Sequence, residues 1–142
     1  MNKITLYFSI IIFFLFASAS GNTKESYFLE GEKLFKQNKF SDSKFKFEQD
    51  IVFNPKSELS YLYLAKIFKK EDNDDFQEQN LNTVILLNPK NEEALYLLTL
   101  LKIKKSDYEE ANNLIKKFVA VCKNFCDKKL ELKTKLQSLE TN

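Results

Sequence analysis

The hydrophobic positions of this chain recur in short helical patterns separated by polar breaks. Apolar residues spaced three and four apart predict helices of about a dozen residues, and the breaks between paired helices fall near residues 37–39, 72–74 and 105–107. Two Asn-Pro pairs, Asn54-Pro55 and Asn88-Pro89, stand 34 residues apart. Proline lacks the N–H that a continuing helix would use, so each pair marks a helix end, where asparagine also tolerates a left-handed conformation.

The predicted helix starts keep the same 34-residue period. Thr23, Ser57 and Asn91 are favoured N-cap residues, whose side-chain oxygens accept from the free N–H groups of a first helical turn. Glutamates follow them, where a carboxylate meets the positive end of the helix dipole. A fixed period shared by starts and stops indicates stacked supersecondary units. The sequence therefore predicts an all-α solenoid of helical hairpins.

Residues at equivalent positions in these units resemble the tetratricopeptide repeat family, whose pattern combines large apolar, small and aromatic residues with a closing proline. The first unit supplies Tyr27, Gly31, Phe40, Ser43, Phe47 and Pro55, and the third supplies Leu95, Thr99, Tyr108, Ala111 and Ile115. The resemblance covers about residues 24–125. It implies a tetratricopeptide-like helical-hairpin solenoid with repeats at 24–57, 58–91 and 92–125, followed by a capping helix at 126–140.

Some positions depart from the family pattern. Gln77 replaces a small residue in the second unit, and Lys102 replaces an apolar residue in the third. The turn at 71–75 is very acidic, and Phe76 stands two positions later than the usual aromatic residue. We therefore expect the second hairpin to have a longer turn than the other two.

The C-terminal segment predicts a helix with one apolar side. Its leucines are Leu130, Leu132, Leu136 and Leu139, and the residues between them are mostly lysine and glutamate. Such a helix suits a solubilising cap over the last repeat of a solenoid. The alternative is a helix that binds a partner or a second copy of the chain.

Cys122 and Cys126 lie between the third unit and this helix. The Cβ atoms of residues four apart on a continuous helix are about 5 to 6 Å from each other. This exceeds the Cβ separation of about 3.5 to 4.5 Å that a disulfide requires. The repeat period places a chain break at Asn124-Phe125, and a turn there permits a bridge that pins the cap. The alternative is a pair of half-buried thiols.

The first 19 residues follow a different pattern. Lys3 precedes an apolar run from Ile4 to Phe16, and small residues follow at 17–20. These are the regions of a secretory signal peptide, and the run is shorter than the roughly 20 residues of a membrane span. We expect export to the periplasm or cell envelope, with cleavage after Ala19; the alternative is an uncleaved anchor that holds the domain at a membrane surface. Abundant lysine without arginine favours an AT-rich bacterial genome.

The residue inventory argues against several functions. Without histidine, no Ser-His-Asp or Cys-His site can form, and two glycines make no phosphate-binding loop. Two thiols alone do not complete a tetrahedral metal site. The lysines are dispersed among acidic residues at a net charge of +2, whereas nucleic-acid binding needs a basic patch. We expect no enzyme activity, cofactor, metal or nucleic-acid partner.

The resemblance implies that a partner binds the inner face of the array, which the first helix of each hairpin lines. Its positions in this chain are Phe28, Glu32, Phe35, Leu62, Lys66, Lys69, Tyr96, Leu100 and Ile103. An apolar face with a few lysines suits a peptide or a helix with an acidic flank. The family's carboxylate-clamp subtype is not matched, because Phe28, Glu32, Tyr63 and Glu93 occupy its positions. The predicted function is a non-catalytic adaptor at the cell envelope; the alternative is a structural subunit that self-associates through the same face.

Overall fold

The computed structural model describes residues 23–140, so the expected signal segment at 1–19 lies outside the described residues. Within the described part the chain forms seven helices. In chain order they are α2 (Thr23–Lys36), α3 (Phe40–Phe53), α4 (Glu58–Lys70), α5 (Asp74–Leu87), α6 (Glu92–Lys104), α7 (Tyr108–Val121) and α8 (Lys128–Glu140). The predicted all-α class is confirmed.

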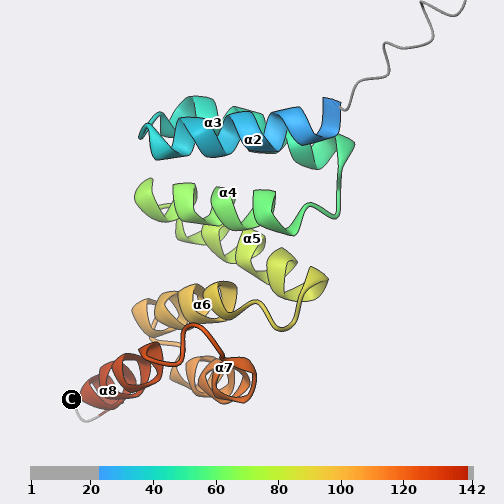
Figure 1. Ribbon diagram of the computed structural model, residues 1–142. Coiled ribbons are helices and arrows are strands. Elements are labelled where there is room, and N and C mark those ends of the chain that lie inside the picture. Colours follow the sequence, from blue (N-terminus) through green and yellow to red (C-terminus); the bar gives the residue numbers. More distant parts are fainter. Residues whose placement is uncertain (1–22, 141–142) are drawn as a thin grey trace, which may run out of the picture.

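The helices pair into three hairpins that stack along one direction (Figure 1). The pairs are α2 with α3, α4 with α5, and α6 with α7, and neighbouring hairpins meet through α3 with α4 and α5 with α6. The last helix, α8, packs against both α6 and α7 at the end of the stack. Three helical hairpins with a capping helix are therefore the architecture of the chain.

The three turns inside the hairpins are alike. Each has three residues, at 37–39, 71–73 and 105–107. The middle residue of each has a positive φ: 60° at Asn38, 53° at Asp72 and 59° at Ser106. The expectation of a longer second turn is wrong, because Asp72 adopts the same left-handed conformation as its counterparts. Phe76 lies inside α5, where its ring stacks on Phe68 at 5.1 Å.

The helix ends follow the sequence prediction only in part. Asn91 caps α6 by accepting from the Ala94 N–H at 2.8 Å, whereas Ser57 makes no side-chain cap and donates to Ser60 instead. Neither Asn-Pro asparagine is left-handed, since φ is −132° at Asn54 and −139° at Asn88. The left-handed residues lie in the turns within hairpins, where the chain reverses most sharply.

Two hydrophobic clusters hold the stack together. The smaller one centres on Phe47 and joins the first hairpin to α4. The larger one runs from α4 through α7 and includes Leu132 and Leu136 of α8. Gly31 brings α2 close to the first cluster, because a Cβ at this position would lie 2.9 Å from the Phe47 ring. The small residue is therefore required by helix packing.

Candidate functional site: the inner face and a cavity at its C-terminal end

The first-hairpin part of the predicted inner face is filled by contacts within the chain. The rings of Phe28 and Phe35 meet the Tyr63 ring edge-on at 6.0 and 5.0 Å. Glu32 accepts from the Tyr63 hydroxyl at 3.0 Å and pairs with Lys36 at 3.1 Å. Burial raises the pKa of Tyr63 to about 12, and the bond to Glu32 adds to this shift. These residues form a half-buried aromatic cluster whose rings and carboxylate are engaged by contacts within the chain.

The middle of the face has three different environments. Leu62 is only 4% exposed and belongs to the larger core cluster. Lys66 pairs with Glu93 at 2.7 Å, and its ammonium group lies over the Tyr63 ring at 5.0 Å. Lys69 is exposed. Of the three predicted side chains of α4, only Lys69 extends freely from the surface.

The third part of the face adjoins α8. Tyr96 donates to Glu131 of α8 at 2.9 Å, and its ring lies 6.4 Å from that of Phe125. Burial raises the pKa of Tyr96 to about 12, with a further contribution from the bond to Glu131. Leu100 is half-buried, and Ile103 is 2% exposed. The cap thus covers Tyr96 but does not cover the whole face.

A cavity of about 530 Å³ lies at the C-terminal end of the inner face. Three of the predicted residues, Lys69, Leu100 and Ile103, line it. Leu101 extends the apolar lining, lysines reach it from α4, α6 and α8, and Asp72 and Asp74 of the second hairpin add two acidic side chains. The structure therefore brings together one part of the predicted site, where an apolar lining meets basic side chains.

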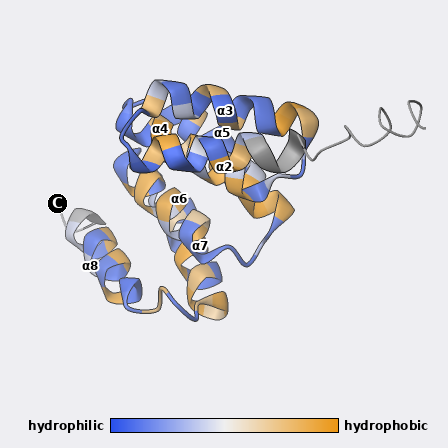
Figure 2. Ribbon diagram, turned by 45° about the horizontal axis from the view of Figure 1, so that its top comes forward, coloured by the Kyte–Doolittle hydropathy of each residue, from blue (hydrophilic) through white to orange (hydrophobic). Residues whose placement is uncertain are grey.

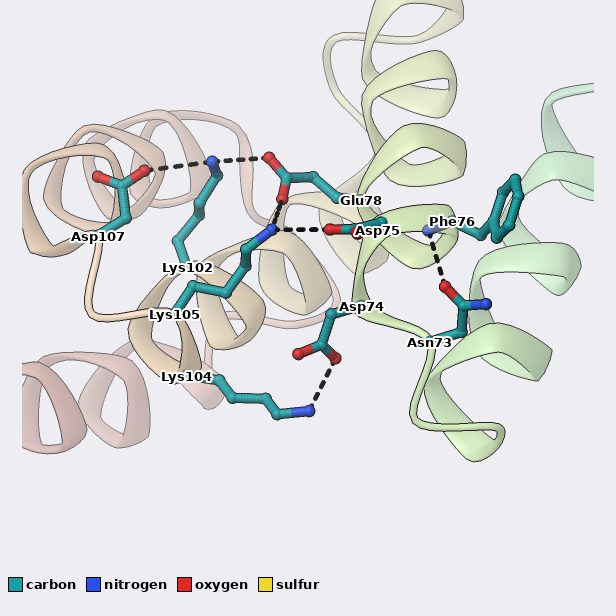
Figure 3. A network of polar contacts seen from close by, with 9 residues as sticks. All are labelled: Asn73, Asp74, Asp75, Phe76, Glu78, Lys102, Lys104, Lys105 and Asp107. Carbon is teal, nitrogen blue, oxygen red and sulfur yellow. Dashed lines mark hydrogen bonds and ion pairs between the residues drawn. The ribbon is translucent and has the colours of Figure 1, made fainter.

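An ionic network that includes part of the cavity lining joins the second hairpin to α6 (Figure 3). Lys104 bonds to Asp72 at 2.6 Å and to Asp74 at 2.8 Å. Lys102 pairs with Glu78 at 2.7 Å, and its hydrogen bond is the main cause of the lowered pKa of Glu78. Lys102 is thus accommodated at an apolar family position because its ammonium group is paired while its stem is half-buried.

The other two lysines of the cavity are available to a ligand. Among the side chains that the structure describes between residues 27 and 138, Lys69 of α4 and Lys135 of α8 have no ion pair. Lys104 is already neutralised by Asp72 and Asp74. The free positive charge of the cavity therefore comes from Lys69 and Lys135.

Sequence reasoning missed the α8 wall of this cavity and a second hollow. Lys135 was part of the predicted cap, and nothing in its spacing indicated which part of the inner face it would approach. The second hollow, about 580 Å³, lies between α5 and α7. Its lining is Asn82, Ile85, Leu86, Pro89, Lys117, Ala120 and Val121. The exposure of Leu86, at 81%, follows from a hydrophobic run at 84–87 that exceeds one helix face.

The two cysteines are bonded to each other in the structure, across the turn that separates α7 from α8. Their Cα atoms lie 5.3 Å apart. Within the enclosed loop, the N–H groups of residues 123, 124 and 125 all donate to one oxygen of Glu92, at 2.8, 2.9 and 2.9 Å. These bonds, led by that from Lys123, hold the pKa of Glu92 below its usual value. The loop is thereby fixed to the first turn of α6.

The described part of the chain contains neither a membrane-spanning helix nor a metal-binding cluster. Among residues 23–140, no helix combines the length and apolar character needed to cross a membrane. No group of three or more histidine, cysteine or acidic side chains in this range is arranged to hold a metal ion.

Solved structures with the same arrangement of helices are numerous, although no family model and no curated protein matches the sequence. The type III secretion chaperone SycD of Yersinia enterocolitica, in complex with a YopD peptide, superposes with a TM-score of 0.75 at 13% identity, covering 87% of this chain and 97% of that one. The chain has the tetratricopeptide-repeat fold. The TPR2B domain of yeast Sti1, in complex with an Hsp70 peptide, gives a TM-score of 0.73 at 17% identity, with 82% and 97% covered. The first tetratricopeptide domain of Spaghetti (RPAP3), bound to an HSP90 peptide, superposes with a TM-score of 0.72 at 18% identity, covering 82% of this chain and 95% of that one.

Proposed function

We propose that this protein is a non-catalytic adaptor that binds a segment of a partner protein in the cavity at the C-terminal end of its inner face. The observation that carries the proposal is the cavity itself, with its apolar lining of Leu100, Leu101 and Ile103 and the unpaired Lys69 and Lys135. Solved tetratricopeptide structures that bind HSP90, Hsp70 and YopD peptides support a role in peptide binding.

The chemistry of the cavity defines the ligand class. An apolar side chain would occupy the leucine and isoleucine lining, where burial contributes about 25 cal/mol for each Å² of apolar surface. An acidic side chain beside it would meet the ammonium groups of Lys69 and Lys135. Each exposed charge pair contributes about 0.2 to 1 kcal/mol. The ligand that fits is a short segment with a leucine or similar residue flanked by glutamate or aspartate.

The place of action that we propose is the cell envelope, on the basis of the N-terminal sequence at 1–19. An exported adaptor would meet extracytoplasmic partners there and hold them in an assembly. Retention of the N-terminal segment would keep the same domain at a membrane surface. Mass spectrometry of the mature N-terminus from the native source tests this part of the proposal, and a cytoplasmic full-length chain would contradict it.

The binding proposal is tested with two fluorescent synthetic peptides, one with a central leucine flanked by glutamates and one with the same leucine flanked by lysines. We expect the acidic peptide to bind more tightly. The double substitution Lys69→Ala with Lys135→Ala should weaken its binding on the order of tenfold, since two charge pairs are lost. The matched control, Lys56→Ala with Lys90→Ala, removes two exposed charges from the connections between hairpins and should change affinity less than twofold.

Two outcomes would contradict the proposal. If neither peptide binds at millimolar concentration, the cavity is not a peptide-binding site. If both double variants lose the same affinity for the acidic peptide, the effect comes from the net charge of the protein and not from the two lysines of the cavity. Size-exclusion chromatography with light scattering distinguishes the proposed adaptor from the competing hypothesis, a structural subunit that self-associates. A stable oligomer at micromolar concentration that excludes the acidic peptide would favour a structural subunit.

A further inference from the structure

We propose that the Cys122–Cys126 disulfide controls the binding cavity by holding α8, which carries one of its walls, against the end of the array. The consequence for binding depends on the function proposed above, whereas the effect on α8 does not. Lys135 of α8 lines the cavity together with residues of α4, α5 and α6. Any motion of α8 away from α6 therefore changes the shape and charge of the site.

The described hydrophobic attachment of α8 to the array is small. Among its described side chains, Leu132 and Leu136 are the buried hydrophobic ones, at 0% and 6% exposure. Leu130 is 74% exposed, and most of the helix surface is hydrophilic (Figure 2). The hydrogen bond from Tyr96 to Glu131 adds one polar contact at the surface. With these two leucines as the buried hydrophobic contacts among its described side chains, α8 depends strongly on how its connection to α7 is fixed.

The disulfide fixes that connection. Cys122 ends α7, and α8 begins at Lys128. The bond between Cys122 and Cys126 closes the intervening chain so that three consecutive N–H groups converge on Glu92. Without the disulfide, the segment at 122–127 can adopt more conformations. Ordering it so that its three N–H groups reach Glu92 then costs more conformational entropy. Reduction should therefore loosen both the Glu92 contact and the start of α8.

The two cysteine residues differ in their exposure to solvent. Cys126 is exposed, whereas Cys122 is half-buried and packs against the larger core cluster. A thiolate of a dithiol reductant would attack the sulfur atom of Cys126. The bond between the two cysteines would then break, and Cys122 would leave as a thiolate. The second thiol of the reductant then displaces Cys126 and forms the reductant's own disulfide. Two electrons and two protons pass to the protein, which ends with two free thiols.

Hydrogen exchange of the purified domain tests the effect on α8. We expect reduction by a dithiol to speed amide exchange in residues 130–138 on the order of tenfold, because the open state of a small foldon becomes more accessible. Exchange in α4 should stay constant. The double substitution Cys122→Ser with Cys126→Ser should exchange like the reduced protein and should not respond to the dithiol. Unchanged exchange in α8, or equal acceleration in α4 and α8, would overturn the proposal.

A second variant tests the same mechanism without touching the sulfur atoms. Glu92→Ala removes the side-chain acceptor of the three loop amides and should speed exchange in α8 several-fold while the disulfide stays closed. Glu48→Ala is the matched control, because Glu48 is exposed on α3, far along the stack from α8. Equal exchange of α8 in both variants would show that the loop does not hold the helix.

Binding of the acidic leucine peptide gives the functional readout. The oxidised domain should bind it about tenfold more tightly than the reduced domain, and the double serine variant should bind like the reduced form. If α8 loosens on reduction but the oxidised domain binds no peptide, the control of α8 holds and the proposed function fails. If the peptide binds equally well in both forms, the cavity does not depend on α8 and the regulation is refuted.

Discussion

Substitution of Gly31 by alanine places two opposite effects at one position. In an exposed helix interior, alanine is more stable than glycine by about 0.5 to 1 kcal/mol. Here the added Cβ would lie 2.9, 3.0 and 3.1 Å from three atoms of the Phe47 ring. Phe47 is fully buried, and its ring stacks on Tyr63 at 4.8 Å, so it cannot turn away as a flexible side chain could.

The clash should outweigh the gain in helix stability. Overpacking of a core typically costs about 1 to 3 kcal/mol, which leaves a net loss of about 1 kcal/mol after the alanine gain is subtracted. The hydrogen bond from Ser43 Oγ to the Gly31 carbonyl, at 2.8 Å, resists the backbone shift that would relieve the contact. For a domain of this size, thermal denaturation followed by circular dichroism should show a midpoint lower by about 3 to 6 °C.

A double-mutant cycle with Phe47→Leu separates the two effects. In the leucine background the ring atoms are gone, so Gly31→Ala should become neutral or stabilising by up to about 1 kcal/mol. The interaction energy between the two substitutions should therefore be about 1 to 2 kcal/mol. A stabilised Gly31→Ala single variant, or equal effects of the substitution in both backgrounds, would refute the packing argument.

Two further predictions concern polar groups between the hairpins. Ser60→Ala should lower the free energy of unfolding by about 2 kcal/mol in chemical denaturation, because the Ser60 hydroxyl donates to Asp50 at 2.5 Å and Asp50 is only 1% exposed. The control Ser41→Ala, at an exposed position, should change the free energy of unfolding by less than about 0.5 kcal/mol. Equal losses in the two variants would contradict the reasoning. Glu78→Gln should lower stability at pH 7 by about 1 kcal/mol but much less at pH 3. The reason is that its lysine partners lower the pKa of Glu78 in the folded state. The ion pairs therefore contribute their full stability above the unfolded-state pKa near 4.5, and this stability is lost as the pH falls through the folded-state pKa. A pH-independent loss, or the same loss in Glu109→Gln, would count against the ion pair.

The periodic features of the fold could be predicted because each rests on local chemistry. Asn-Pro pairs stop helices wherever they occur, and steps of three and four place apolar residues on one helix face. The turn geometry was harder to predict, because Asp72 occupies the left-handed position by virtue of its short polar side chain rather than by a glycine signal. Of the acidic residues that suggested a longer turn, Asp72 and Asp74 instead pair with Lys104 of the next hairpin.

The candidate site was predictable only where it follows the repeat register. Lys69, Leu100 and Ile103 were placed on the inner face by their positions in the units, and they do line one cavity. The filling of the first-hairpin face by the Tyr63 contacts could not be read from spacing, because it depends on the side-chain directions of two helices. The approach of Lys135 depends on how the chain turns after α7, which the loop at 122–127 determines.

Methyl NMR of the oxidised domain, titrated with the acidic leucine peptide, tests directly whether a partner segment binds in the cavity on the inner face. The methyl groups of Leu100, Leu101 and Ile103 report on the inner cavity, and those of Ile85, Leu86 and Val121 report on the hollow between α5 and α7. We predict saturable shifts at the first set, accompanied by little change at the second. Shifts confined to the second set would show that the partner binds the outer surface and would contradict the proposed site.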